Sequence, residues 1–234
     1  FFDGKGIRKG NGSATFLGDQ FTYNIARNKQ GEVSVDLKGG LKTEVLNLSD
    51  STLTSFLKGT SSWSGNVRKT DNGFELKVQS KLKGISSSLP HPFRKKSGDW
   101  VHANLQVNWL PGGQRVVELK LLDIVTTRLT EIDGKLLGVI AIGKEVQVPE
   151  GEAGLELVVA LNSVDLDHWR QVFSGKQGSF KGLLDKNKLT IDKASFRIGS
   201  IKWLQRRFNN IDLTVQKEKT VWQGSFTARQ GRGK

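Results

Sequence analysis

An alternation of apolar and polar side chains with a period of two residues is the feature that most constrains the fold. In one segment the apolar residues occupy every second position: Val101, Ala103, Leu105, Val107 and Trp109. The same alternation recurs in four shorter segments: residues 33–37, 74–78, 196–198 and 211–215. Because successive side chains of a strand point to opposite faces, each segment predicts a strand with one apolar face and one solvent-exposed face. Such half-buried strands are typical of antiparallel sheets.

Two segments have helical spacing instead. Residues 49–57 carry a Ser or Asp cap and an apolar stripe, with Gly59 as a stop. Residues 165–173 repeat this pattern, with Asp165 as the cap. We therefore predict an all-β fold with two short helices, built as an extended, curled, mostly antiparallel sheet with one apolar face. That face is either an open groove or the inside of a partly closed sandwich, since the same alternation fits both.

A weak internal repeat suggests how the chain is organised. One stretch near each end has a short strand, a glycine, a second strand, a charged turn and a third strand that ends in glycine. We predict a single β-rich segment over residues 1–234, with repeat units 1–60 and 165–234 on either side of a central sheet, 61–164. Repeated units of this kind favour an extended, stackable sheet over a closed enzyme core. The chain contains no methionine, even at position 1, so we expect it to be a segment of a longer protein.

No group of residues has the spacing of a catalytic or metal site. The chain has no cysteine, and its three histidines are far apart and lack the spacing of metal ligands. Residues 138–144 match the pattern G-x-x-x-x-G-K, but Glu145 stands where a phosphate-binding loop needs Ser or Thr. The apolar interior of that match predicts a buried strand. We therefore predict a protein that is not an enzyme, with no catalytic residues, no metal and no cofactor.

The chain is strongly basic. It has 36 Lys and Arg against 23 Asp and Glu, a net charge of +13, which favours an anionic partner such as nucleic acid, an acidic membrane surface or an acidic substrate. The basic residues are scattered among the alternating segments, which favours solvated strand faces, so no nucleic acid is expected as the partner. A basic nucleic-acid-binding β domain stays open as the less favoured alternative, and it predicts an affinity that falls steeply with salt.

The stretch from Ser80 to Lys96 has a more specific signature. It reads SKLKGISSSLPHPFRKK and fits the pattern S-x-L-x-G-[VI]-x-x-x-L-P-x-P-[LF]-x-K. This pattern resembles the end of a strand in the YhdP branch of the AsmA-like periplasmic proteins. Three further segments resemble motifs of that family in the same order: LKGTSSW, VDLDHWRQVF and ASFRIGSIKWLQRRFNNIDLTVQ. Gln205 departs from the glycine usual in the family, which leaves the local turn geometry open.

The resemblance covers most of the chain and implies a segment of a long periplasmic protein of the Gram-negative envelope, whose parent is anchored in the inner membrane outside this chain. It implies a curled sheet with an apolar groove, similar to bridge-like lipid-transfer proteins. The implied function is non-enzymatic movement of phospholipid between the inner and outer membranes, which supports the permeability barrier of the outer membrane. The implied partners are phospholipid acyl chains, together with anionic lipid head groups as further candidates.

A structural or interaction module of the envelope, binding protein or peptidoglycan, stays open as an alternative. Such a module predicts a closed core and no bound lipid. The lipid reading instead predicts groove residues on the apolar face of 101–109 and on its expected hairpin partner: Val101, Leu105, Val107, Trp109, Leu119 and Leu121.

The proline-rich stretch between these strands predicts a structural rim. Pro90 and Pro92 withhold donors from the sheet and fix an extended backbone, so we expect them to end a strand while Phe93 packs back onto the apolar face. A basic cluster follows: Arg94, Lys95 and Lys96. These cations either discourage pairing at the sheet edge or meet lipid phosphates, and edge protection is the favoured interpretation.

Overall fold

The computed structural model describes these residues: 2–3, 6–7, 9–16, 19–46, 52–143, 154–174, 190–218, 221–229 and 231–233. Most of them lie in strands. The strands of the main sheet are β3 (Lys9–Phe16), β4 (Asp19–Arg27), β5 (Val33–Lys42), β6 (Leu57–Thr70), β7 (Gly73–Ser80), β8 (Ile85–Ser87), β9 (Ala103–Trp109), β10 (Arg115–Leu121), β11 (Val125–Ile132), β12 (Lys135–Ile142), β13 (Leu155–Asp165), β14 (Lys193–Trp203), β15 (Arg206–Glu218), β16 (Val221–Ala228) and β17 (Gly231–Gly233).

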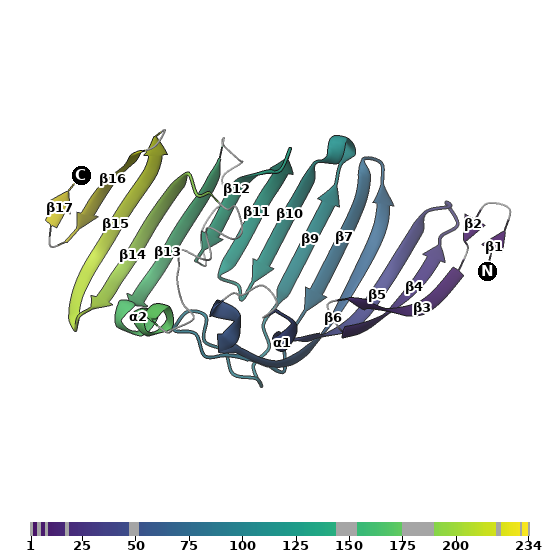
Figure 1. The fold of residues 1–234 in the computed structure, drawn as a ribbon, viewed down its shortest axis with the longest axis horizontal. Coiled ribbons are helices and arrows are strands. Elements are labelled where there is room, and N and C mark those ends of the chain that lie inside the picture. The colour runs from purple at the N-terminus through teal and green to yellow at the C-terminus, as the bar shows by residue number, and fades with distance from the viewer. Residues whose placement is uncertain are drawn as a thin grey trace.

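These strands form one 15-stranded sheet (Figure 1). Its order is β17-β16-β15-β14-β13-β12-β11-β10-β9-β7-β6-β5-β4-β3, and β8 pairs with β6 beside this path. Neighbouring strands are antiparallel except at β13, which is parallel to both β12 and β14. A separate two-stranded sheet joins β1 (Phe2–Asp3) and β2 (Gly6–Ile7). Because the two end strands β3 and β17 do not pair with each other, the sheet is open, and the predicted extended, mostly antiparallel fold is confirmed.

Every segment with two-residue alternation overlaps a strand of this sheet. The segment 101–109 enters β9 only at Ala103, because the preceding residues belong to the connection from β7. There the backbone N–H of Val101 donates to the carbonyl of Lys81 at 2.8 Å. The pairing of strands continues through all three predicted units of the chain, and their division into repeats stays a prediction.

The second predicted helix is confirmed as α2 (Leu166–Ser174). Asp165 caps this helix, because its Oδ1 accepts a hydrogen bond from the backbone N–H of His168 at 3.1 Å. That hydrogen bond, assisted by the ammonium of Lys202, holds the pKa of Asp165 below its ordinary value. Local sequence therefore sets where this helix begins.

The first predicted helix is present as a short 3₁₀ helix, η2 (Thr52–Phe56), and it ends one residue earlier than predicted because Leu57 already begins β6. Residues 49–51 lie outside the described residues. Pairing of β6 with β8 from Leu57 onward takes precedence over a last helical turn. A four-residue helix that the sequence did not predict, α1 (Thr43–Leu46), directly follows β5.

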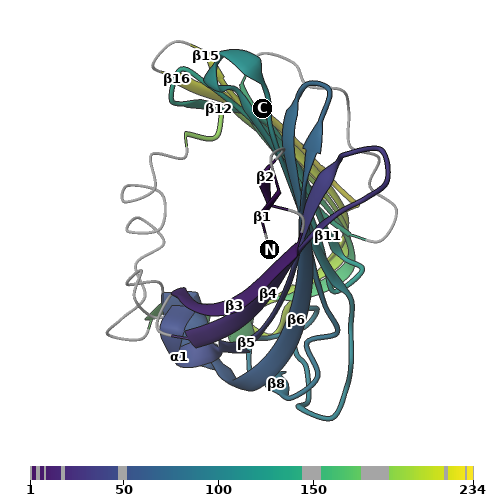
Figure 2. The same cartoon turned by 90° about the vertical axis from the view of Figure 1, so that its right-hand side faces the viewer.

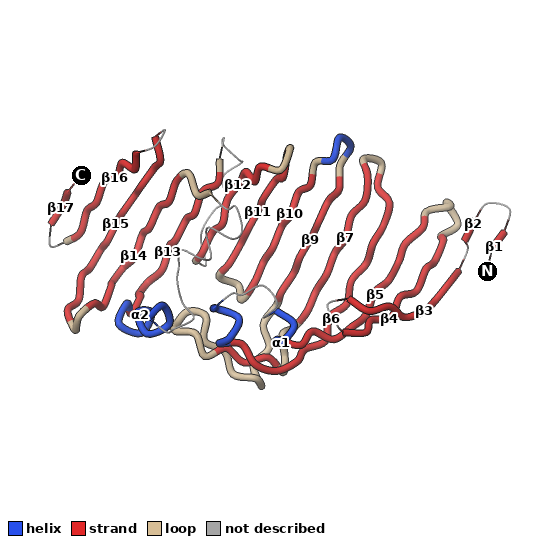
Figure 3. The backbone as a smooth tube through the Cα atoms, viewed as in Figure 1, coloured by secondary structure: helices blue, strands red, loops and turns tan. Residues whose placement is uncertain are grey.

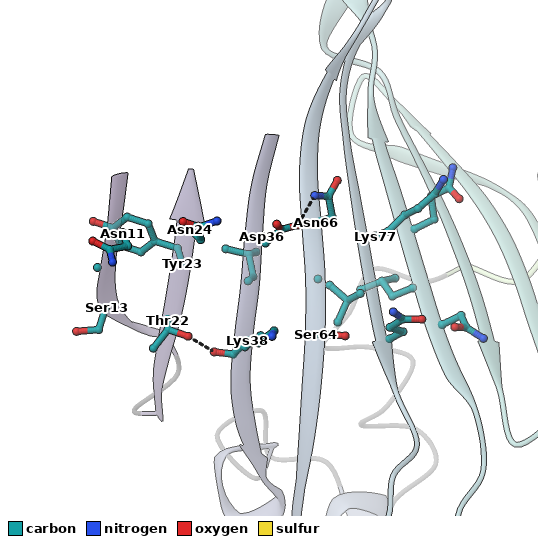
Figure 4. A pocket seen from close by; sticks show the side chains of 18 of the residues that line it. Asn11, Ser13, Thr22, Tyr23, Asn24, Asp36, Lys38, Ser64, Asn66 and Lys77 are labelled. Atoms are coloured by element: carbon teal, nitrogen blue, oxygen red, sulfur yellow. Dashed lines mark hydrogen bonds between the residues drawn. The ribbon is translucent and has the colours of Figure 1, made fainter. Parts of the chain in front are cut away.

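The sheet is curled about its long axis (Figure 2), and α1 and α2 lie along the same rim of the sheet (Figure 1). In Figure 1 the strands run from β3 at the right to β17 at the left, with the concave side toward the viewer. In Figure 4 this order is reversed, because β3, which carries Ser13, lies to the left of β7, which carries Lys77. Figure 4 therefore shows the sheet from its convex side. The polar residues of the alternation lie on that convex face, and the apolar residues consequently line the concave one.

The parallel strands are the best-buried part of the sheet. Val139 and Ala141 of β12 are only 2% and 1% exposed, although they lie on the otherwise polar face. Leu155 of β13 is 1% exposed on the concave face. Burial on both faces is typical of parallel strands and explains the continuous apolar runs in this region. The phosphate-loop match at 138–144 accordingly begins inside β12, which Figure 3 draws as a strand, and the burial of Val139 and Ala141 confirms the predicted buried strand.

Candidate functional site

Rows of mainly apolar side chains cross the concave face at right angles to the strands. Pairing register places one central row on successive strands from β4 to β16: Tyr23, Leu37, Gly65, Val78, Leu105, Leu119, Thr127, Ile140, Leu157, Ala194, Val215 and Gly224. With neighbouring strands about 4.8 Å apart, this row is about 50 Å long. Most of its side chains are only half-buried, because no second layer of described strands or helices covers them.

Four of the predicted groove residues come together in the middle of this face. Leu105 of β9 lies directly opposite Leu119 of β10, and Leu121 lies one pair further along the same face. Val107 adds a fourth half-buried side chain, two residues beyond Leu105. This cluster spans two adjacent strands, as the expected hairpin requires. Its contact with lipid stays a prediction.

The other two predicted groove residues lie at the ends of this segment. Trp109 is the last residue of β9, faces Arg115 across the strand pair and is 37% exposed. Val101 precedes β9 and is half-buried in the connection from β7. The structure therefore places the central four on the sheet and these two at its margins.

An aromatic pair extends the apolar face toward the N-terminal strands. The rings of Phe21 and Trp63 lie 6.1 Å apart between centroids, and the indole N–H of Trp63 donates to the carbonyl of Gly40 at 2.9 Å. A Cβ on Gly39 would stand 2.7 Å from the Trp63 ring. Gly39 thus leaves room for the indole to lie flat on the sheet, where it widens the apolar surface.

The proline-rich loop between β7 and β9 forms part of the lower rim in Figure 1. Its short strand β8 pairs with the start of β6. Beyond β8 the carbonyl of Pro90 accepts the N–H of Phe93 at 3.0 Å, and the bond between His91 and Pro92 is cis. The ring of Phe93 meets Trp169 of α2 edge-on, with centroids 5.9 Å apart. Phe93 therefore joins this loop to α2.

Within the basic cluster, Lys95 has a different environment from its neighbours. Its residue surface is 7% exposed, and its Nζ donates to the backbone carbonyls of Ile85, Lys96 and Asp99 at 2.7, 3.1 and 2.6 Å. Burial lowers the pKa of Lys95, and the nearby Asp99 carboxylate partly offsets that effect. This ammonium holds the loop together from inside and is turned away from any partner in solution.

Arg94 and Lys96 are exposed. Of the three predicted rim cations, these two are available to protect the sheet edge or to meet a lipid head group. Neither role is tested by their position, and both stay predictions.

The convex face carries a polar hollow of about 1210 Å³ (Figure 4). Residues of β3 to β7, β9 and β10 line it, most of them amides, hydroxyls, lysines and carboxylates. The sequence pattern did not predict this hollow. Its polar residues are the polar positions of the alternating segments, but only the pairing register shows that these positions lie side by side on adjacent strands.

Glu75 anchors the polar face at one margin of the hollow. It is 6% exposed, it pairs with Arg68 and Lys77, and Gln106 Nε2 donates to its Oε2 at 2.9 Å. Burial by itself would raise the pKa of the Glu75 carboxyl, but the hydrogen bonds from Arg68 and Lys77 outweigh it and hold the pKa below its ordinary value. The carboxylate is therefore an internal link between β6, β7 and β9.

The described residues contain no group of three or more His, Cys, Asp or Glu side chains placed to hold a metal ion. None of the helices among them is long and apolar enough to cross a membrane.

The fold and these two surfaces define a class of protein: a long, open, curled sheet that is apolar on its concave side and polar on its convex side. The chain belongs to the YhdP protein family, whose model matches residues 1–234. This result confirms the resemblance drawn from the four sequence motifs. Neither the curated proteins nor the solved structures contain a match to the chain.

Proposed function

We propose that this chain is a non-enzymatic segment of a periplasmic, bridge-like lipid-transfer protein. In this proposal the parent is anchored in the inner membrane, and phospholipid moves along it between the inner and outer membranes. The transfer supports the permeability barrier of the outer membrane. The acyl chains contact the concave face, and the head groups stay toward solvent or the rim.

The observation that supports the proposal is the long, mainly apolar row on a concave face that no described strand or helix covers. The row of about 50 Å exceeds the roughly 30 Å thickness of a bilayer's hydrocarbon core, so it is longer than any single acyl chain. A globular protein of ordinary kind would cover such a surface with a second layer, because large exposed apolar surfaces favour association. An acyl chain can take the place of that layer.

The energetics favour this kind of occupant. Burial of an acyl chain contributes about 0.8 kcal/mol for each CH₂, and it requires no specific polar contact. Binding is then tolerant of position, which suits lipids that move along a row. Membership of the YhdP family supports a role that involves no bond chemistry.

Native mass spectrometry with lipid extraction tests the proposal on the chain purified from a bacterial periplasm. We expect phospholipid in near-stoichiometric amount. The variant L105Q/L119Q places two amides in the central row and should lower the bound lipid at least two-fold. The matched control is V116Q/L137Q, which changes two half-buried apolar residues on the convex face.

The control variant should keep the lipid content of the unchanged chain. A lipid-free chain, or an equal loss in both variants, would contradict the proposal. The first result would favour a structural or interaction module of the envelope, and binding of nucleic acid by the lipid-free chain would favour the basic β domain.

A further inference from the structure

The hairpin between β14 and β15 ends in an exposed apolar tip. Trp203 lies opposite Arg206 in the last pair of strand residues, so the turn consists of Leu204 and Gln205. Trp203 is 49% exposed and Leu204 is 59% exposed. The tip lies beside α2 on the rim that both helices share (Figure 1). Turns are usually made of small and polar residues, so two large apolar side chains at this point need an explanation.

The backbone of the turn does not supply that explanation. Leu204 and Gln205 have φ angles of 50° and 61°, which is the left-handed conformation that a two-residue hairpin turn requires and that Asn-Gly fits best. Leu122 has a similar φ of 58° in the short turn between β10 and β11, but its side chain is half-buried. Leu204 has neither a favourable backbone conformation nor burial against the described part of the chain.

The tip is held in place by the start of α2. The carboxylate of Asp167 accepts the backbone N–H of Leu204 at 2.9 Å and that of Gln205 at 3.3 Å. Asp165, the cap of α2, accepts a hydrogen bond from the ammonium of Lys202 at 3.3 Å. These contacts engage both neighbouring carboxylates within the protein. They also fix the turn to a helix, so the apolar tip is presented in one orientation.

Two arginines follow the turn. Arg206 and Arg207 are exposed, and neither has an ion-pair partner among the residues that the structure describes. The charge of Lys202, in contrast, is compensated by Asp165. The five residues 203–207 therefore combine two exposed apolar side chains with two uncompensated positive charges.

We propose that this hairpin tip docks on the anionic surface of a lipid bilayer. Tryptophan favours the head-group level of a membrane, an exposed leucine is buried at the boundary of the acyl chains, and arginines are attracted to anionic lipids. A nucleic-acid strand would engage the arginines and the indole but leave Leu204 in water. A bilayer therefore accounts for every exposed group of the tip except the amide of Gln205. The docking uses the rim of the sheet and does not rest on lipid transfer along the concave face.

Co-sedimentation of the folded chain with vesicles tests this site. Vesicles of phosphatidylethanolamine and phosphatidylglycerol should bind at least five-fold more chain than vesicles of phosphatidylcholine. The variant L204N/Q205G gives the turn its preferred sequence, so it should raise the temperature of unfolding and yet lower vesicle binding at least three-fold. Its matched control is Q205G, which keeps the leucine and should bind like the unchanged chain. A loss of binding that accompanies a gain in stability cannot result from misfolding.

The variant R206Q/R207Q tests the charges and should also lower vesicle binding at least three-fold. Its control is K69Q/K135Q, which removes two exposed lysines at the opposite rim and should have little effect. The proposal is overturned if L204N/Q205G binds vesicles as well as the unchanged chain does. It is also overturned if the two charge variants lose binding equally, since the net charge of the chain would then explain the attraction.

The two proposals can fail separately. The groove variant L105Q/L119Q should dock on vesicles like the unchanged chain, because the tip is intact. L204N/Q205G should in turn keep the lipid that co-purifies with the chain.

Discussion

The buried ammonium of Lys95 gives the sharpest test of how the rim loop is held. In the variant Lys95→Met the side chain keeps a similar length, but the carbonyls of Ile85, Lys96 and Asp99 lose their common donor. We expect the free energy of unfolding to fall. The loop should loosen locally before the rest of the sheet, since β8 is a strand of three residues that joins the sheet through the start of β6.

The magnitude follows from three charge-assisted hydrogen bonds. Each contributes about 1.5–3 kcal/mol, but removal of the ammonium also relieves a desolvation cost of several kcal/mol. Water reaches part of this loop and can satisfy some of the released carbonyls. The net destabilisation should therefore be about 2–4 kcal/mol.

Urea unfolding measures the global effect, and hydrogen exchange measures the local one. The N–H groups of Gly84 and Ser87 donate to Ser97 and Lys95 carbonyls, both at 2.8 Å, and should exchange faster in the variant. Lys96→Met, on the exposed neighbour, is the control and should change stability by less than about 0.5 kcal/mol. The reasoning is refuted if Lys95→Met behaves like this control by both measurements.

Three further changes test other parts of the structure. Glu75→Gln should lower the free energy of unfolding by about 1–2 kcal/mol at pH 7, as measured by urea unfolding. Because the pKa of Glu75 is depressed in the folded chain, this difference from the unchanged chain should shrink as pH falls below about 4.5. A difference that does not change with pH would argue against the ion pairs. Phe93→Ala should remove the edge contact with α2, lowering stability by about 1 kcal/mol and altering tryptophan fluorescence, whereas Phe93→Leu should do less. Gly59→Ala should cost about 2 kcal/mol or more in thermal unfolding, because φ is 110° and a Cβ would strike the Gly84 carbonyl oxygen; Gly40→Ala, with open space around it, should be close to neutral.

Alternation predicted the strands well because the polar positions directly indicate which side of a strand faces solvent. Alternation could not distinguish an open groove from a closed sandwich, because in both folds every second side chain of a strand lies on the apolar face. The decision depends on long-range pairing, in which β3 and β17 stay apart and no described layer faces the concave side. The alternation also could not predict the parallel pairing around β13, because Val139 and Ala141 make both faces of the neighbouring strand β12 apolar.

Individual residues show the same division between local and long-range information. The cap at Asp165 is local, and the helix after it was predicted correctly. The segment ending at Leu57 also has helical spacing, but pairing with β8 makes its last residue the start of a strand. Lys95 could not be told from Arg94 and Lys96 by sequence, because its burial depends on a loop that folds around its ammonium.

An open sheet of this kind has two faces that must each be compatible with water or with a partner. On the convex face polar groups are paired within the sheet around Glu75, and other polar side chains meet water. On the concave face half-buried Leu and Val side chains remain in contact with water unless something covers them. Apolar surface left in water forfeits about 25 cal/mol for each Å², so a bound acyl chain would stabilise the sheet as well as be carried by it.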